Sequence, residues 1–285
     1  MKVLVTSCFF LFIILNSYSQ TPDNNPTEKK IAPWYVERFK VSAGFFLPVN
    51  NTSIQVSAKG GAAGTDIDFE KDLGYKSDQL TFLANFQWRI SRKSRLNLNY
   101  YNIPRNTTHT LQRDITFNDK TYNVNTTVSS FFNTAIYQVS YGYAILAKPK
   151  YELGLMIGTH LVGAKVGIAV TGAGGAAAKS SDFRFTAPLP DLGLWGGYAF
   201  SDRFAVNLDI DYLSLTIGNI SGSIFAYSLL FTYRLVDKLD IGLGYNGLNF
   251  NITANKNNAE GKLNWGYNGP ALGVTYSFGN KSWAN

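Results

Sequence analysis

Apolar and polar residues alternate along many stretches of this chain. The clearest stretch is 204–212, Phe-Ala-Val-Asn-Leu-Asp-Ile-Asp-Tyr, in which an apolar residue occupies every second position. Successive side chains of a β-strand point to opposite faces, so this pattern predicts a strand with one apolar and one polar face. Its repetition down the chain predicts an all-β protein.

The connections between these stretches are of two kinds, and they bound the strands. Tight turns are predicted at 91–94, 147–150, 201–202 and 237–238, and looser connections near 60–64, 118–120, 172–181, 219–222 and 255–261. Together they separate ten predicted strands: 38–58, 65–90, 95–117, 121–146, 151–171, 183–200, 203–218, 223–236, 239–254 and 262–278. Counts of eight or twelve stay open, because periodicity alone does not separate short strands cleanly.

Strands of this kind reach a stable state when they close into a ring whose apolar face meets lipid. The expected fold is therefore a closed antiparallel transmembrane up-and-down β-barrel. Bacterial barrels of this class have short periplasmic turns and longer external loops. The tight turns and, for an even strand number, both termini are accordingly expected in the periplasm. A soluble β-sandwich is the alternative, but it would expose aromatic faces on nearly every strand to water.

The amino-terminal segment predicts export from the cytoplasm. After Met1-Lys2 the chain is apolar from Val3 to Leu15, and Ser17 and Ser19 place small residues before a cleavage site. The apolar run is shorter than the roughly 20 residues of a transmembrane helix. We therefore expect a signal peptide at 1–19, a periplasmic leader at 20–37, the barrel at 38–278 and a carboxy-terminal tail at 279–285.

Composition supports this picture and excludes some partners. The chain is 45% apolar, 15% aromatic and only 16% charged, and Cys8, inside the predicted signal, is its one cysteine. The formal net charge of +7 is not concentrated in a basic cluster beyond 89–95. This argues against nucleic acid as a partner and favours solvated loop charge or contact with anionic lipid head groups.

Aromatic residues on the predicted lipid-facing side gather beside the tight turns. Such a girdle is typical of a barrel at the membrane–water interface, where a ring lies partly in lipid and partly in water. The predicted girdle consists of Trp88, Tyr143, Tyr151, Phe200, Phe204, Tyr233 and Tyr276.

The last strand carries Gly273-Val274-Thr275-Tyr276-Ser277-Phe278. This resembles the carboxy-terminal signal of Gram-negative outer-membrane proteins, with Gly273, Tyr276 and Phe278 at the matching positions, although seven further residues follow here. Residues 38–278 as a whole resemble the small outer-membrane β-barrels. The segments 67–74 and 151–154 are similar to parts of an uncharacterised group of them. The resemblance implies an outer-membrane location, contact with outer-membrane lipid and lipopolysaccharide, and recognition by the barrel-assembly machinery.

The polar faces of the strands carry the candidate site. Strand parity places four basic and four acidic side chains inside the barrel: Lys40, Arg89, Arg95, Arg234, Glu152, Asp209, Asp211 and Asp240. Buried charges are tolerated when they are paired and hydrogen-bonded. An internal ion-pair network that fills the lumen is therefore favoured over a narrow pore, since barrels of about eight strands are filled by side chains.

Candidates for catalysis or metal binding are weak. Asp209 and Asp211 lie two apart on one strand, but a filled lumen leaves no room for a substrate. His160 is expected inside the barrel, and His109 in an external hairpin, where Asp114 or Asp68 is its possible partner. The alternating acidic residues at 66–72 do not match a calcium loop. We expect no catalytic residue, metal or cofactor.

The favoured function is a non-enzymatic surface, structural or interaction protein with a charge-plugged lumen. A narrow small-solute channel is the alternative, and an envelope enzyme of the lipid A-modifying or protease type, built on His109, is a third hypothesis. The sequence does not identify the surface partner.

Overall fold

The computed structural model describes residues 32–58, 64–118, 120–171, 177–255 and 259–279. The predicted signal peptide, most of the leader and all but one residue of the tail lie outside the described residues. No helix in the described part of the chain is long and apolar enough to cross a membrane.

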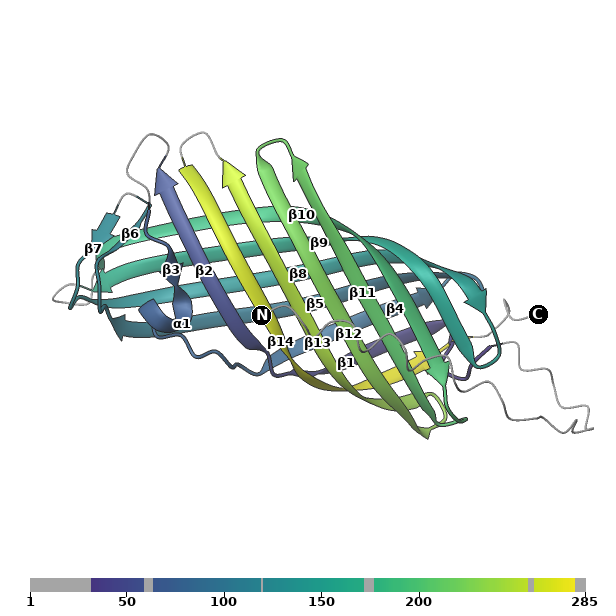
Figure 1. Ribbon diagram of the computed structural model, residues 1–285. Helices are drawn as coiled ribbons and strands as arrows, with labels where there is room; N and C mark the ends of the chain where they lie inside the picture. Colours follow the sequence, from purple (N-terminus) through teal and green to yellow (C-terminus); the bar gives the residue numbers. More distant parts are fainter. Residues whose placement is uncertain (1–31, 59–63, 119, 172–176, 256–258, 280–285) are drawn as a thin grey trace, which may run out of the picture. The chain divides into compact units, whose positions relative to one another are not determined.

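The described residues form one closed barrel wall (Figure 1). Neighbouring strands are antiparallel, and β14 pairs back with β1 to close the ring. Among the described residues the ring has ten strands: β1 (Phe39–Phe46), β4 (Thr81–Arg89), β5 (Ser94–Thr110), β8 (Thr127–Ala147), β9 (Tyr151–Thr171), β10 (Ala177–Ala199), β11 (Phe204–Ile217), β12 (Ile220–Val236), β13 (Leu239–Asn255) and β14 (Ala259–Phe278). The expected closed antiparallel barrel is confirmed.

One end of the barrel, called here the turn end, holds the tight turns, the start of β1 and the end of β14. Two of these turns are stabilised in the same way. The Ser91 hydroxyl accepts hydrogen bonds from the backbone N–H of Lys93 and Ser94. The Ser201 hydroxyl does the same for Arg203 and Phe204. The opposite end is called the loop end.

The wall departs from the predicted strands near the loop end. Residues 65–90 do not form one strand: β3 (Ile67–Asp68) is followed by the short helix α1 (Phe69–Asp72) and an extended segment that leads to β4. The Asp68 side chain caps α1 by accepting the Lys71 N–H, and Gly74 has a φ of +68°, which glycine adopts without strain. The strand predicted at 95–117 ends at Thr110 and is followed by a hairpin of β6 (Ile115–Phe117) and β7 (Lys120–Tyr122).

The loop predicted at 172–181 is shorter than expected, because β10 begins at Ala177. Residues 172–176 lie outside the described part. The first predicted strand, 38–58, is interrupted at 47–48, where Pro48 cannot donate a ladder hydrogen bond. Beyond this break β2 (Val49–Ala58) pairs with the loop-end half of β14.

Apolar side chains change face half-way along the barrel. On β9, Leu153, Leu155 and Ile157 are exposed on the outer wall, whereas Val162 and Val166 are buried inside. The half of the barrel next to the tight turns, called the turn half, thus carries an exposed apolar belt and a polar interior. The other half, called the loop half, has an apolar interior and a polar outer face.

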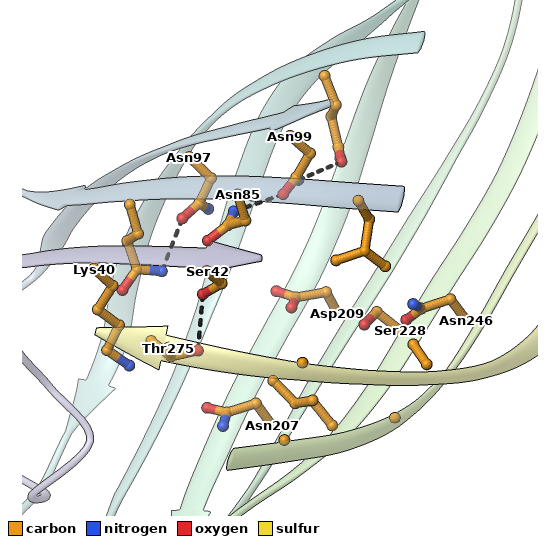
Figure 2. A pocket seen from close by; sticks show the side chains of 18 of the residues that line it. Lys40, Ser42, Asn85, Asn97, Asn99, Asn207, Asp209, Ser228, Asn246 and Thr275 are labelled. Carbon is orange, nitrogen blue, oxygen red and sulfur yellow. Dashed lines mark hydrogen bonds between the residues drawn. The ribbon is translucent and has the colours of Figure 1, made fainter. Parts of the chain in front are cut away.

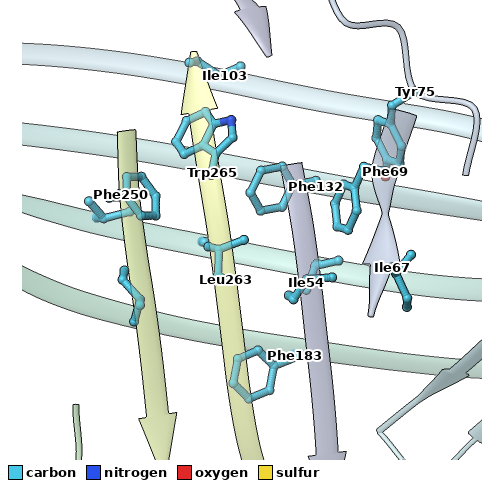
Figure 3. Packing of buried hydrophobic residues seen from close by; sticks show 14 of the residues in the cluster. Ile54, Ile67, Phe69, Tyr75, Ile103, Phe132, Phe183, Phe250, Leu263 and Trp265 are labelled. Carbon is cyan, nitrogen blue, oxygen red and sulfur yellow. The ribbon is translucent and has the colours of Figure 1, made fainter. Parts of the chain in front are cut away.

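Two of the strand pairs separate in the loop half. β10 pairs with β11 only from Leu192 to Ala199, and β4 pairs with β5 only from Leu83 to Arg89. Within the described residues the wall here becomes two sheets, β5-β8-β9-β10 and β11-β12-β13-β14-β2. Figure 3 shows strands of the second sheet running across those of the first, with buried side chains between them.

This apolar core fills the interior of the loop half. Trp265 lies at its centre, with its ring 5.7 Å from that of Phe132 and 5.2 Å from that of Phe250, both edge-on. Other members come from both sheets and from the β3–α1 segment: Ile54, Ile67, Phe69, Ile103, Val162, Phe183, Ile252 and Leu263. The loop half is therefore closed by packed side chains.

Candidate functional site: a polar chamber

The interior of the turn half encloses a cavity of about 250 Å³, called here the chamber. Figure 2 shows polar side chains from several strands pointing into it, among them Lys40, Asn85, Asp209 and Asn246. Gly242, Gly244 and Gly273 line one side, where the absence of side chains leaves room.

Glu152 holds the most buried ion pairs of the chamber. Its carboxylate accepts two hydrogen bonds from Arg89, of 2.9 and 3.2 Å, in the bidentate geometry that suits a guanidinium. Arg92, from the adjoining turn, also contacts Glu152. The Glu152 side chain is fully buried, so these arginines supply the hydrogen bonds that water would otherwise provide.

Arg95 connects the two sides of the chamber. Its Nη2 lies 2.6 Å from Oδ1 of Asp209, and its guanidinium stacks 3.8 Å from the centre of the Trp195 ring. Gly142 and Gly154 make room for this indole, since a Cβ on either residue would lie under 3.0 Å from it. The pair therefore combines charge with a cation–π contact.

The described end of the leader covers the turn end of the chamber. Arg234 pairs with Asp240 at 3.4 Å and with Glu37 at 3.5 Å, and it also donates to the Trp34 carbonyl. The Trp34 indole in turn donates to the Ser201 carbonyl at 2.8 Å. Tyr35 and Val36 are buried against Ala199 and Ala205. These contacts seat residues 34–37 in the turn end rather than leaving them as a free leader.

Amides form a continuous chain along another wall. Asn85 donates to Asn99 at 2.5 Å, Asn99 donates to Gln138 at 2.7 Å, and Gln138 lies 3.5 Å from Asp211. Such a network fixes side chains that would otherwise need water.

Lys40 differs from the other predicted charges. It is on the chamber wall, yet among the described side chains no carboxylate lies within 4.0 Å of its ammonium group; the ring centre of Tyr35 is 5.7 Å away. The structure thus brings seven of the eight predicted charges into direct ion-pair or hydrogen-bond contacts and leaves Lys40 facing the cavity.

Sequence reasoning did not single out all of the interior groups. Asp191 lies 2.8 Å from Nδ1 of His160 and is buried, and Arg92 and Glu37 extend two of the ion pairs. Asp191 could have been found by parity, because it alternates with the outward Leu192 and Leu194. Arg92 lies in a turn, where parity gives no direction.

Apolar side chains form the roof of the chamber. Leu83, Tyr101, Leu248 and Tyr267 line the cavity and also belong to, or pack against, the apolar core of the loop half. The chamber is thus bounded by the core on one side and by the residues 34–37 on the other.

The candidate site at His109 lies apart from the chamber. His109 packs against Gly74, while Asp114 accepts the Val124 N–H and Asp68 caps α1. Neither aspartate is hydrogen-bonded to His109. Among the described residues no three histidine, cysteine, aspartate or glutamate side chains gather as metal ligands.

Residues 64–80, called here the clasp, lie between β2 and β5 and include β3, which pairs with β2. Glu70 accepts from the Thr52 N–H at 3.0 Å and from Arg105 at 2.6 Å. Asp72 accepts two hydrogen bonds from Arg113, of 2.9 and 2.5 Å. The clasp is thus joined to β2 by backbone pairing and to Arg105 of β5 through a side chain.

The Asp72–Arg113 pair should make the clasp sensitive to acid. Burial by itself raises the pKa of Asp72, but hydrogen bonds from Arg113 and the Asp68 N–H, with the charge of Arg113, hold it below its ordinary value. A depressed carboxyl pKa stabilises the fold above the unfolded value of about 3.9, and the effect is lost as pH falls through the folded pKa. Arg113 is about half exposed, so we expect only about 0.2–1 kcal/mol.

This prediction is measured by comparing the urea midpoint of the wild type with that of Asp72→Asn between pH 7 and pH 2. The difference between the two proteins should be present at pH 7 and disappear at the acidic end. A difference that is independent of pH would show that the ion pair is not its source.

The predicted girdle and assembly residues occupy the turn half. Tyr143, Tyr151, Phe200, Phe204, Tyr233 and Tyr276 are exposed on the outer wall, and Trp88 is partly covered by Phe39. On β14, Tyr276 and Phe278 point outward and Gly273 lies on the chamber side.

Solved structures similar to this chain are outer-membrane barrels. The outer membrane protease OmpT from Escherichia coli matches with a TM-score of 0.54 and 12% identity, over 86% of this chain and 100% of that one. The translocator domain of autotransporter NalP from Neisseria meningitidis gives 0.43 and 13% identity, over 84% and 88%. No family model and no curated protein matches the sequence. The chain therefore has the fold of an outer-membrane β-barrel.

Proposed function

We propose that this protein is a non-conducting outer-membrane barrel that holds the loop half outside the cell as a rigid body for contact with a surface partner. The observation that carries the proposal is the reversal of polarity along the strands. A wall with an apolar outer face suits lipid, whereas a wall with a polar outer face and apolar interior suits water.

The outer face of the loop half supports its position in water. Ser223, Asn251, Asn264 and Ser53 lie directly opposite one another across four adjoining strands. Neutral hydrogen-bonding side chains in such a row would be costly in hydrocarbon. They offer a partner many donors and acceptors with little charge.

The orientation follows from the lengths of the connections. Short turns in this class face the periplasm, so the turn end, with both ends of the described chain, is proposed to face the periplasm and the loop end the cell exterior. In this orientation the belt contacts outer-membrane lipid, and β14 presents Gly273, Tyr276 and Phe278 to the assembly machinery.

The filled loop half predicts that the barrel does not conduct. In the described part of the chain, packed apolar side chains fill the loop half, and residues 34–37 lie over the other end of the chamber. Reconstituted in a planar bilayer, the purified protein should give no stable single-channel steps. Steps of reproducible size in the wild type would favour the alternative, a narrow small-solute channel, and remove the plugged-barrel proposal.

Partner contact is tested by changing the outer face without touching the core. Asn251→Lys combined with Asn264→Lys should reduce adhesion of whole cells to the surface they bind at least severalfold, while heat-modifiable migration on gels stays normal. Tyr143→Phe on the belt is a matched control that leaves the loop half unchanged. Equal adhesion in all three strains would count against a role for this face.

A further inference from the structure

The separation of β10 from β11 leaves an apolar notch in the wall, called here the seam. Pairing between these strands stops at Leu192 and Tyr212, and beyond this point β10 pairs with β9 and β11 with β12. The notch has a volume of about 70 Å³. Its lining is Pro188, Leu189, Pro190, Leu213, Leu215, Ile220, Gly222 and Ile224.

Two prolines of β10 explain why its pairing with β11 ends at the seam. Proline has no backbone N–H and is confined in sheets to edges and bulges. Pro188 and Pro190 are two residues apart, so both missing donors fall on the same edge of β10. The ladder between β10 and β9 continues past both of them without a register shift, which assigns the edge without donors to the β11 side. Pairing with β11 therefore cannot extend beyond Leu192.

The inner side of the seam also depends on one residue, Gly222. A Cβ on Gly222 would lie 2.7 Å from Cδ2 of Leu189, so glycine at this position lets the leucine side chain seat between the strands. Leu189 and Ile224 are both buried and belong to the apolar core. The notch is thus backed by packed apolar side chains, and all the side chains that line it are apolar.

The open side of the seam lies beside the apolar belt, at the border of the belt that is nearer the loop end. Leu192, Leu194 and Tyr212 are exposed on the outer wall next to the seam, on its turn-end side. Leu215 is 45% exposed although it lies on the same face of β11 as the interior residue Asp211. Further toward the loop end the outward residues of β10 are charged, with Asp182 and Arg184 forming an exposed ion pair.

The seam accordingly lies where the lipid-facing wall gives way to the polar wall. An open strand edge is unfavourable in hydrocarbon because its N–H groups lack partners, and the two prolines remove donors from the β10 side of the seam. The notch between the two strands is lined by apolar side chains and adjoins the belt.

We infer that the seam binds an acyl chain of a membrane lipid, which enters sideways from the leaflet at the loop end. The notch is small, about 70 Å³, and its apolar side chains offer an alkyl segment dispersion contacts. The inference rests on the barrel lying in a membrane and not on its contact with a surface partner. Single-channel steps or unchanged adhesion, which would overturn the proposed function, would therefore leave this inference unchanged.

Native mass spectrometry of the full protein tests the inference. The protein is reconstituted with palmitoyl-oleoyl phosphatidylethanolamine, extracted in mild detergent and examined for retained phospholipid. Leu215→Asn removes an apolar wall of the seam, whereas Leu208→Asn makes the same change on the same strand in the open belt, where Leu208 is 42% exposed. Both variants must show normal heat-modifiable migration before they are compared.

Retention by Leu215→Asn should fall about tenfold or more, and retention by Leu208→Asn should match the wild type. Equal losses in both variants would mean that the belt as a whole holds the lipid, and no loss in either would mean that the seam holds none. A parallel arm offers free palmitate, and retention of palmitate without phospholipid would overturn the commitment to a membrane lipid.

A second measurement is independent of detergent extraction. Leu213→Cys places a bimane label at the seam in a chain whose other cysteine, Cys8, lies in the predicted signal. In liposomes its fluorescence should be quenched severalfold more by phospholipid brominated on the acyl chain than by aqueous iodide. The same label at Asn251, on the polar outer face, should show the opposite order. A Leu213 label quenched like the Asn251 label would refute acyl-chain binding.

Discussion

Replacing Trp265 with alanine should lower the free energy of unfolding by about 3–5 kcal/mol, the range typical of large aromatic side chains removed from a core. Trp265 is 1% exposed and is enclosed by Phe132, Phe250 and Tyr267. Its indole N–H also donates to Asn50 at 3.2 Å, so the variant leaves a cavity and an unpaired amide. Since both sheets of the loop half pack on this ring, no single neighbour can move to fill the space.

The loss is measured from the urea midpoint of refolding into liposomes, with heat-modifiable gel migration as the readout. The loop half should also become sensitive to protease added to intact cells, while the turn half stays protected. Trp88→Ala is the control, since Trp88 lies on the outer wall of the turn half and lipid can replace it. A Trp265→Ala protein as stable as Trp88→Ala would show that the core does not hold the two sheets together.

Replacing Glu152 with alanine should have a similar effect for an electrostatic reason. The change leaves Arg89 buried without its bidentate partner, and removing one member of a buried ion pair costs about 3–5 kcal/mol. Arg92 loses the same carboxylate, so the two arginines would keep their positive charges while the negative charge between them is missing. Stability in urea should fall accordingly.

Two further variants separate charge from volume. Glu152→Ala combined with Arg89→Met should recover part of the loss, because it removes the unpaired guanidinium and keeps an apolar stem. Asp182→Ala breaks the exposed pair with Arg184 and should change stability by no more than about 1 kcal/mol. A Glu152→Ala loss as small as that of Asp182→Ala would mean that water reaches Arg89.

Strand periodicity was sufficient to predict the barrel and the inward charges of the turn half. Parity is a local property of the backbone, so Glu152 and Asp209 could be assigned to the same face as their partners without knowing which strands adjoin. The pairing itself was not predictable: Arg95 reaches Asp209 across the barrel, and that distance depends on the size of the closed ring.

The loop half was harder to predict, because parity does not say which face is inside. On β13 the apolar positions change from Leu243 and Tyr245 to Leu248, Phe250 and Ile252, a shift visible in the sequence. Interpreting it requires knowing that the wall splits into two sheets there. The clasp was missed for another reason: its alternating acidic residues are typical of a strand, but Asp68 and Gly74 together favour a capped turn.

The position of β14 has a consequence for the order of folding. This strand closes the ring by pairing Phe278 with Phe39, and its other half carries Trp265 into the core between β13 and β2. Both events join the two ends of the described chain, and contacts of such sequence separation form slowly. Neither the chamber nor the core is complete before β14 has paired with β1 and β2. Closure of the ring and completion of the interior are therefore coupled in one slow step of folding.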